Sequence, residues 1–374
     1  MISRRGAKLQ INTINLCINT CQGESFKQNK LILSPNYSDR MKKFLYFILL
    51  ITIAVSFTRC ETDFNVIADY KEIAVVYGLL NQNEDVHYLR INKAFLGEGN
   101  ALTYAKIADS SSYGSNIDVV LTETTPSGSK KDIVFDTVTL YNKQDGVFYA
   151  PGQLFYKANA KLNQANTYSL SVTDKKTGYN VSAETKLIND FGFTIPSAGS
   201  KSISFKRAIT QTKSFEWENA KNGKRYQLTV HFFYKESRGF GDTTMKVIDW
   251  DFPSVSSPRT DGTGKSEVAY LNESFFTLCL NRIPYSDPAV EGAVLLRIAD
   301  NIDLEMTVID EDFSTYLDVN GPSTGVSMDK PQYTNITNGL GLFSSRYQIH
   351  RIIALNAETR LDLSSTTLKF QPPQ

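Results

Sequence analysis

Apolar side chains recur at every second position over several stretches of the chain, and this period restricts the possible folds more than any other feature. Between Tyr226 and Tyr234, every even-numbered residue is apolar, while most odd-numbered residues are polar. The same alternation is present at residues 117–121, 168–172 and 302–308. A period of two places the apolar side chains on one face of a β-strand. We therefore predict an all-β fold whose strands each bury one face.

Turn-forming dipeptides and one polar segment divide these strands into two groups. Asp-Gly at residues 145–146 and Asn-Gly at residues 222–223 are typical of hairpin turns. The segment at residues 188–201 separates a first group of roughly seven strands, the size of an immunoglobulin-like sandwich, from a longer tract. We therefore expect an N-terminal immunoglobulin-like β-sandwich at residues 70–190 and a larger β-rich C-terminal domain at residues 191–374.

One short helix is predicted within the second domain. Phe313, Tyr316 and Leu317 stand at positions i, i+3 and i+4, which places them on one helical face. Asp310 or Asp312 is a suitable cap for its first turn, and the Asn-Gly-Pro tripeptide that follows would end it. We expect this helix to lie against a sheet.

Residues 41–59 have the pattern of a secretory signal, with two lysines followed by an apolar run. The fourteen uncharged residues from Phe44 to Phe57 would form roughly 21 Å of helix, which is shorter than a hydrocarbon core of roughly 30 Å. Cys60 follows directly, as the lipid-bearing cysteine does in bacterial lipoproteins. Arg59 departs from the small residue that is usual before that cysteine. A plain secretory signal is the alternative.

Three further expectations concern the segments around this signal. Residues 1–40 show no apolar periodicity, and we interpret them as an extension from a start site assigned too early, with Met41 as the true start; a genuine extension is the alternative. Residues 60–69 would form a lipidated tether. Within it, Glu61 and Asp63 resemble the acidic export signal that directs such lipoproteins to the outer leaflet.

Charge argues against a nucleic-acid partner. Residues 1–59 contain nine of the 40 Lys and Arg residues but two of the 39 Asp and Glu residues. The rest of the chain therefore has 31 basic and 37 acidic residues, a net charge of −6, and no basic cluster. Because phosphate backbones require a positive surface, we expect no binding to nucleic acid.

Residues typical of catalysis and metal binding are sparse. His87, His231 and His350 lie far apart in strand-like sequence, and neither a nucleophile elbow nor a zinc-protease motif is present. Cys279 lies among Phe and Leu residues and is expected to be a small core residue. We therefore predict a non-enzymatic protein with no metal site and no cofactor.

Asp249-Trp250-Asp251 is the best candidate for a ligand loop in this sequence. Its two carboxylates flank an indole at the edge of a long polar loop. Paired acids can hydrolyse glycosides or bind calcium, and an indole can stack on a sugar. On a strand, however, residues i and i+2 point the same way, and such acid pairs are common at solvated strand ends. Both interpretations remain open from the sequence.

A tract near the C-terminus resembles a family motif. It runs from Asn335 to Phe343 as NITNGLGLF, and the aromatic-rich stretch EDFSTYLDVNGPST precedes it. Together with the signal, the strand YKEIAVVYGLL and the stretch YSLSVTDKKTGYNVSAETKLI, it resembles the Bacteroidota-type surface lipoproteins that contain domain of unknown function four-two-four-nine. Family members have a similar asparagine, glycine pair and aromatic residue, which correspond here to Asn335, Gly339, Gly341 and Phe343. The resemblance covers nearly all of the chain after the signal.

The resemblance implies a location and a class of function. The family has no established biochemical activity, and its members often accompany TonB-dependent outer-membrane transporters. A lipid-anchored protein of the outer membrane, facing the cell surface, is therefore expected, either binding a ligand or assisting such a transporter. The alternative is a secreted or surface-anchored hydrolase acting on glycans or peptides. Read from the residues alone, the motif is either a glycine-rich corner, in which Asn338-Gly339 suits a positive φ, or a loop that binds a ligand or a partner.

Overall fold

The protein is described here by a computed structural model, which covers most of the chain after residue 71 and one short segment before it. The described ranges are residues 42–48, 72–94, 101–141, 143–149, 152–207, 211–239, 241–287, 289–321 and 332–373. The chain divides into two compact units, Met1–Val66 and Ile67–Gln374.

In the first unit, residues 42–48 form an exposed helix. Within the described ranges, no helix has both the length and the apolar character needed to cross a membrane. The predicted extension at residues 1–40, the tether at residues 60–69, Cys60, Glu61 and Asp63 all lie outside the described residues.

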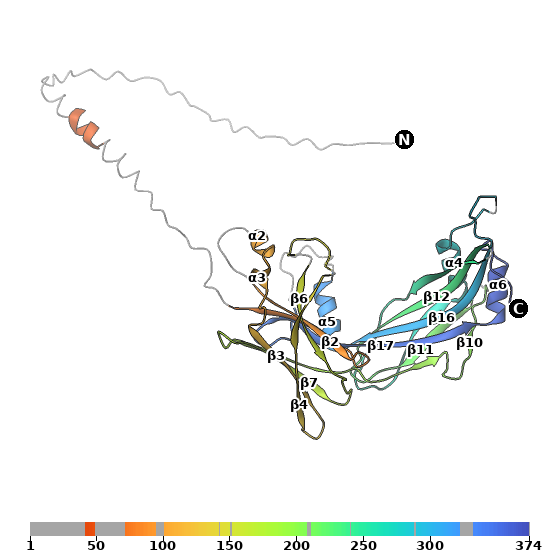
Figure 1. The fold of residues 1–374 in the computed structure, drawn as a ribbon, viewed down its shortest axis with the longest axis horizontal. Coiled ribbons are helices and arrows are strands. Elements are labelled where there is room, and N and C mark those ends of the chain that lie inside the picture. Colours follow the sequence, from red (N-terminus) through yellow and green to blue (C-terminus); the bar gives the residue numbers. More distant parts are fainter. Residues whose placement is uncertain are drawn as a thin grey trace, which may run out of the picture. The chain divides into compact units, whose positions relative to one another are not determined.

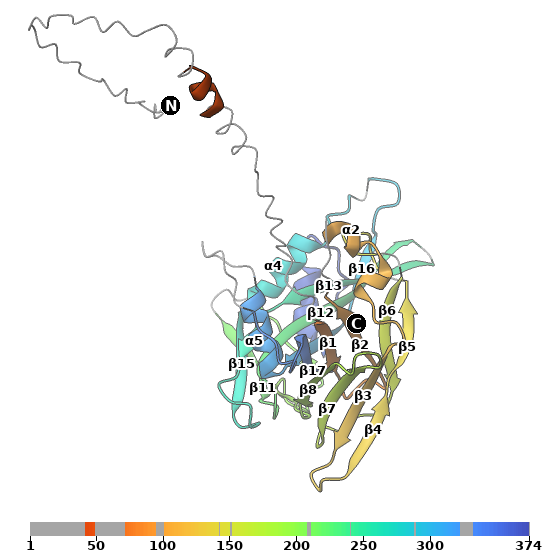
Figure 2. The ribbon, with the colours of Figure 1, turned by 90° about the vertical axis from the view of Figure 1, so that its left-hand side faces the viewer.

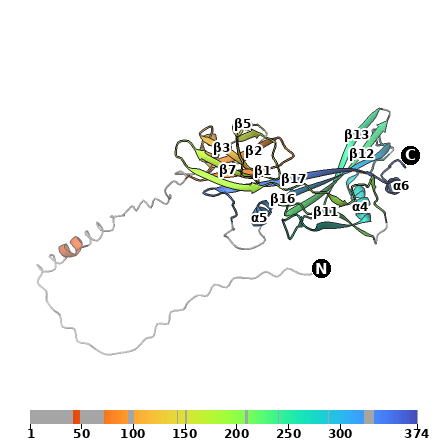
Figure 3. The same cartoon turned by 90° about the horizontal axis from the view of Figure 1, so that it is seen from below.

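A long mixed sheet runs through the second unit from one end to the other (Figures 1 and 3). Its strands follow the order β13-β12-β16-β17-β1-β2-β6-β5, with β10 beside β17 and β14 beside β12. Their bounds are β1 (Ala74–Leu80), β2 (Val86–Lys93), β5 (Asp136–Leu140), β6 (Gln153–Asn159), β10 (Ser202–Ile203), β12 (Arg225–Gly239), β13 (Asp242–Asp251), β14 (Val255–Ser256), β16 (Leu296–Ile309) and β17 (Leu340–Leu355).

At one end, a second sheet packs against β1, β2 and β6 and completes a sandwich. This sandwich sheet has the order β4-β3-β7-β8, with β3 (Ile117–Thr124), β4 (Lys130–Val134), β7 (Thr167–Asp174) and β8 (Asn180–Lys186). Alternate residues of the two sheets, among them Val76, Leu89, Leu121 and Leu170, form one buried apolar cluster. The core of the sandwich therefore lies between the two sheets.

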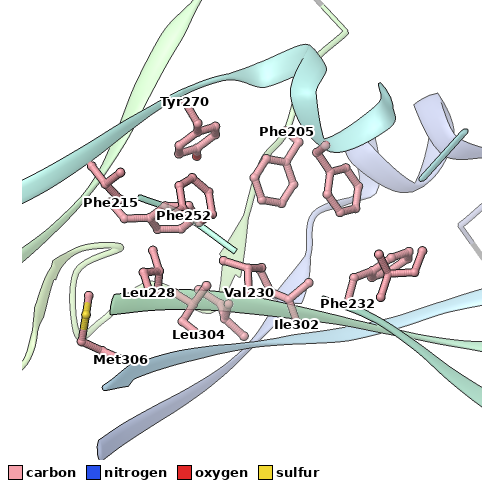
Figure 4. Packing of buried hydrophobic residues seen from close by; sticks show 14 of the residues in the cluster. Phe205, Phe215, Leu228, Val230, Phe232, Phe252, Tyr270, Ile302, Leu304 and Met306 are labelled. Carbon is pink, nitrogen blue, oxygen red and sulfur yellow. The ribbon is translucent and has the colours of Figure 1, made fainter. Parts of the chain in front are cut away.

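At the other end, a small sheet and two helices cover the inner face of β12, β16 and β17. The small sheet has the order β15-β11-β9. The bounds are β9 (Phe193–Ile195), β11 (Thr212–Glu218), β15 (Lys265–Leu271), α4 (Asn272–Arg282) and α6 (Ala357–Ser364). Figure 4 shows two facing layers, with Phe215 and Tyr270 opposite Leu228 and Leu304. Each fully buried side chain of this kind stabilises the fold by roughly 1.5–3 kcal/mol.

The sequence prediction of alternating, half-buried strands is confirmed. Every even-numbered residue from Tyr226 to Tyr234 is buried, and so are the even-numbered residues from Ile302 to Val308. Their odd-numbered neighbours form the opposite face, here called the outer face, which is turned away from the core. The all-β class is thereby confirmed.

The helix predicted before the family motif is also confirmed. It is α5 (Glu311–Asn320), and the Asp310 side chain caps it by accepting a hydrogen bond from the Phe313 amide at 2.9 Å. Further helices were not predicted: α2 (Ala101–Ala105), α3 (Ala108–Ser111), α4 and α6. The apolar run in α4 is short, and periodicity cannot assign so short a run to helix or strand. Cys279 of α4 is fully buried, as predicted.

The long sheet continues across the predicted domain boundary between residues 190 and 191. β1, β2, β5 and β6 precede that boundary, whereas β12, β13, β16 and β17 follow it, and all belong to the same sheet. The connection is the parallel pairing of β1 with the first half of β17, whose second half pairs with β10. Residues 67–374 accordingly form one compact unit.

Candidate functional site

A cavity of about 560 Å³ lies on the outer face of the long sheet at its sandwich end. Its floor comes from β1, β2 and β6, and its walls come from α3 and the segment at residues 143–149. Figures 1 and 2 show α2 beside β6 at this end of the sheet. We call this cavity the cationic pocket, after its charged lining residues Arg90, Lys93 and Lys143.

Strand alternation places the floor of the cationic pocket on the outer face. In β1, Val76 points into the core, whereas its neighbours Val75 and Tyr77 point outward. The antiparallel register sets Tyr77 opposite Arg90 and Val75 opposite Asn92. Because paired residues share a face, these four side chains form one continuous surface.

Arg90 is held in place by a chain of hydrogen bonds. Its Nε donates to Oδ1 of Asn92 at 3.0 Å, and Nδ2 of Asn92 donates to the carbonyl of Ser111 in α3 at 2.9 Å. No described residue accepts a hydrogen bond from the terminal nitrogens of Arg90, and no described carboxylate pairs with it. Among the described residues, the guanidinium is thus held through Nε alone.

Lys143 reaches the cationic pocket from the opposite wall. Its Nζ donates to the carbonyls of Phe148 at 3.1 Å and Tyr149 at 2.9 Å, and lies 5.6 Å from the centre of the Phe148 ring. Burial, and secondly the positive charge of Arg90, lower the pKa of the Lys143 ammonium. The two cations therefore repel each other across the cavity, and among the described lining residues no Asp or Glu separates them.

Tyr77 connects the cationic pocket to α5. Its ring meets that of Tyr316 edge-on, with centroids 6.3 Å apart, and the two hydroxyl oxygens lie 3.4 Å apart. The hydrogen bond with Tyr316, together with burial, raises the pKa of Tyr77 to about 12. The phenol is therefore uncharged at neutral pH, and it can donate a hydrogen bond or stack on a ligand.

The lining of the cationic pocket combines charged, polar and aromatic side chains. The described lining residues include cations, hydroxyls, an asparagine and aromatic rings, but no His, Asp, Glu or Cys. A thiol nucleophile is thus missing from the described lining. Across the described ranges, no cluster of three or more His, Cys, Asp or Glu side chains has the arrangement of a metal site.

The predicted ligand loop Asp249-Trp250-Asp251 lies at the end of β13, and its three side chains do not converge. Trp250 points inward, where it packs on Phe252 with ring centroids 4.5 Å apart. Asp249 and Asp251 point to the outer face, opposite His231 and Thr229 of β12. The indole and the carboxylates thus occupy opposite faces of the sheet, so they cannot contact one small ligand together.

The two carboxylates belong to a polar ladder on the outer face. Oδ1 of Asp249 lies 2.7 Å from Nδ1 of His231, whose Nε2 lies 3.2 Å from Oε2 of Glu305. Burial lowers the pKa of His231, but the hydrogen bonds and charges of Asp249 and Glu305 outweigh it and leave the pKa raised. Oγ1 of Thr229 donates to Asp251 at 2.8 Å. Each acid therefore has a neighbour that binds it.

The family motif lies where β17 begins, and its asparagine bonds to the backbone of its aromatic residue. Nδ2 of Asn335 donates to the Phe343 carbonyl at 2.7 Å, and the Phe343 amide donates to Oδ1 of Asn335 at 2.9 Å. The same Nδ2 donates to Asp312 of α5 at 2.9 Å. Asn335 thus closes the loop between α5 and β17.

The two glycines of the motif allow β17 to approach β1. A Cβ on Gly341 would lie 2.0 Å from the Val76 carbonyl oxygen, and a Cβ on Gly339 would lie 2.9 Å from that of Ala74. Gly341 also has a φ of +112°, which side chains disfavour. The motif residue Thr337 pairs with Ser182 of β8 in an isolated bridge. These contacts join both sheets of the sandwich at one corner.

Sequence reasoning missed the cationic pocket. Arg90, Lys93 and Lys143 are isolated cations in the sequence, and Lys143 lies more than fifty residues from Arg90. The alternation in β2 predicts only that Arg90 points away from Leu89 and Ile91. No local pattern indicates that residues 143–149 lie beside the same strand, since that proximity depends on the course of the chain.

The comparisons with known proteins identify the family. No curated protein matches the chain. The family model described as Domain of unknown function (DUF4249) matches residues 61–348. That match spans the cationic pocket, the polar ladder and the motif, and it confirms the family predicted from the sequence. The chain therefore belongs to the family defined by this domain of unknown function, DUF4249.

Proposed function

We propose that the protein is a non-enzymatic, lipid-anchored binding protein of the outer-membrane surface that assists a TonB-dependent transporter. The observation that carries the binding role is the cationic pocket. Its volume of about 560 Å³ falls within the range of small-molecule sites. Its charged residues are half-buried, and none of them is paired with a described carboxylate. Such an arrangement is expected where a ligand completes the site.

Support for the non-enzymatic role comes from the chemistry of the described side chains. The described lining of the pocket supplies hydrogen-bond donors and aromatic surface, but no His, Asp, Glu or Cys. The acids Asp249 and Asp251, which suggested a hydrolase, are each bound to a neighbouring strand and are separated from Trp250 by the sheet. No feature of the described residues favours the hydrolase alternative.

Support for the anchor comes from the sequence around Cys60. The basic start, short apolar run and cysteine at residues 41–60 have the order required for a lipoprotein signal. One acyl chain binds a membrane only weakly, and the several chains of a lipoprotein would hold the protein firmly. The pocket would then be presented at the surface, beside the transporter that takes up the captured ligand.

Membrane partitioning and intact mass test the anchor. We expect the natively expressed protein to fractionate with the outer membrane and to begin at an acylated Cys60. The variant Cys60→Ala should become soluble, because it has no thiol to acylate. Cys279→Ala is the matched control, since Cys279 is buried in α4 and should leave the protein anchored. A wild-type chain that is soluble, or that has no acyl mass, would contradict the proposal.

Affinity purification from the native outer membrane tests the transporter role. The tagged wild-type protein should copurify with a TonB-dependent transporter in a fixed ratio that survives mild detergent. Tagged Cys60→Ala should recover less of it, because the loss of the anchor lowers the local concentration at the membrane. Recovery of the wild-type protein without any such transporter argues against this part of the proposal.

A further inference from the structure

The hydrogen-bond geometry of the cationic pocket indicates what charge a ligand must carry. Arg90 uses Nε to bind Asn92, so its two terminal nitrogens form the free end of the guanidinium. Two parallel N–H groups match the two oxygens of a carboxylate, sulfate or phosphate. Lys143 contributes an ammonium group on the other wall. An oxyanion between them would replace repulsion with attraction on both sides.

The rest of the lining indicates what the oxyanion must be attached to. Tyr77, Phe148 and Tyr149 provide aromatic surface, and Val75 and Leu154 provide aliphatic surface. More than a third of the Tyr77, Phe148 and Tyr149 surface is exposed, although such rings normally favour burial. A ligand with an apolar or aromatic body would cover these rings while its charged group meets the cations.

We infer that the cationic pocket binds a small molecule in which an oxyanion is joined to an apolar or aromatic body. The oxyanion lies against the terminal nitrogens of Arg90 and near the ammonium of Lys143. The body lies against Tyr77, Phe148 and Tyr149. This inference rests on the proposed binding function and narrows its ligand to one chemical class.

Two dyes that differ by a single oxyanion test the inference. The probes are 1-anilinonaphthalene-8-sulfonate and N-phenyl-1-naphthylamine, which share their rings and differ in the sulfonate. Binding is followed by fluorescence titration on the full chain with Cys60→Ala as background, so that neither acyl chains nor detergent bind the dyes. We expect the sulfonate dye to bind at least about tenfold more tightly, because it gains charge-assisted hydrogen bonds.

Three variants locate the binding. Arg90→Gln should lower the affinity for the sulfonate dye roughly 10- to 100-fold and leave the affinity for the neutral dye unchanged. Lys131→Gln removes one positive charge from β4 of the sandwich sheet, away from the pocket, and should change neither affinity. Ala108→Trp adds an indole to the α3 wall and should abolish the binding of both dyes. Circular dichroism then checks that this variant is folded.

The outcomes separate a failure of the oxyanion inference from a failure of the proposed binding function. If Ala108→Trp leaves both affinities intact, the dyes bind elsewhere and the proposed binding role of the pocket is overturned. If Ala108→Trp abolishes both but the two dyes bind equally well, the pocket binds ligands and the oxyanion inference alone is overturned. An equal effect of Lys131→Gln and Arg90→Gln would also overturn it, because general charge would then explain the preference.

Competition identifies the source of the oxyanion. Benzoate, phenyl phosphate and phenyl sulfate are added against the bound sulfonate dye, with benzyl alcohol as the uncharged control. Vesicles of phosphatidylglycerol supply the same phosphate chemistry as a lipid headgroup. Displacement by the free aryl anions, but not by benzyl alcohol, supports the small-molecule ligand. Displacement by vesicles alone would overturn it and assign the site to a lipid.

Discussion

Two arginines on the long sheet show how differently its two ends use charge. Arg297 of β16 points into the core at one end, and its side chain is 1% exposed. Its Nε lies 2.9 Å from Oε1 of Glu236, and its terminal nitrogens donate to the carbonyls of Leu368 at 2.7 Å and Pro284 at 3.0 Å. Arg90 at the other end binds Asn92 through Nε and has no described partner for its terminal nitrogens.

The contrast separates structural charges from those of the candidate site. A buried cation without partners strongly disfavours folding, and each of the three side-chain nitrogens of Arg297 has an acceptor. Arg90 can remain incompletely paired because the cavity admits water, and a ligand can replace that water. The same rule applies to the polar ladder, where Asp249, His231 and Glu305 satisfy one another. Incomplete pairing in an oriented side chain is therefore the feature that distinguishes the candidate site.

Removing Arg297, the buried arginine, should have the largest effect on stability. We expect Arg297→Met to lower the free energy of unfolding by about 3–5 kcal/mol, because it leaves Glu236 buried without a partner. Urea denaturation followed by tryptophan fluorescence measures the change. The double variant Arg297→Met with Glu236→Leu should recover most of the loss. If the single variant lowers the free energy of unfolding by less than about 1 kcal/mol, Arg297 contributes no more to stability than a surface charge does.

Disrupting the junction between the two ends should have the next largest effect. Gly341→Ala should cost roughly 2–4 kcal/mol, since its Cβ would overlap the Val76 carbonyl and its φ is +112°. Thermal unfolding by calorimetry measures this loss. Gly128→Ala is the matched control, because that glycine also has a positive φ but no atom within 4 Å of its Cβ. An equal loss of stability in the two variants would show that the close approach of β1 to β17 does not contribute to the effect of Gly341→Ala.

The polar ladder should make stability depend weakly on pH. The pKa of His231 is raised above its ordinary 6.5, so its protonated form is favoured by folding. This stabilisation is fully present below pH 6.5 and is lost as the pH rises through the raised folded-state value. We expect a decrease of less than about 1 kcal/mol, because the partner Asp249 is half-exposed and solvent screens it.

Denaturation between pH 6 and pH 8.5 measures this slope in the wild type and in two variants. His231→Gln should abolish the His231 contribution, because glutamine does not titrate. Asp249→Asn should move the decrease to lower pH, because it removes one of the groups that raise the pKa. If the dependence of stability on pH is unchanged in His231→Gln, its assignment to His231 is wrong.

Removing Arg90, the arginine of the cationic pocket, should have the smallest effect on stability. Arg90→Gln should change the free energy of unfolding by less than about 0.5 kcal/mol, since Arg90 makes one described hydrogen bond and no described ion pair. The same urea denaturation that reports on Arg297→Met measures it. A loss above about 2 kcal/mol would place Arg90 with Arg297 among the structural charges and remove the contrast between the two ends.

The strands and the capped helix could be predicted because both depend on near neighbours in the chain. In β12 and β16, alternation correctly assigned which side chains are buried, since a strand turns successive residues to opposite faces. The helix α5 was predicted from its i, i+3, i+4 spacing and a cap at Asp310 or Asp312, and the structure identifies Asp310 as the cap. Trp250 shows the limit of this reasoning. Its flanking acids made this tripeptide a candidate ligand loop, but the indole faces the core and the acids face outward.

The sequence by itself determined the β class, the buried faces of β12 and β16, and the family through a short motif of asparagine, glycines and an aromatic. Only the tertiary structure decided that β1 and β17 pair across more than 250 residues, joining two groups of strands into one sheet. It also decided that Lys143 faces Arg90. Local patterns report the side on which a residue lies, whereas a pocket depends on which distant segments fold beside it.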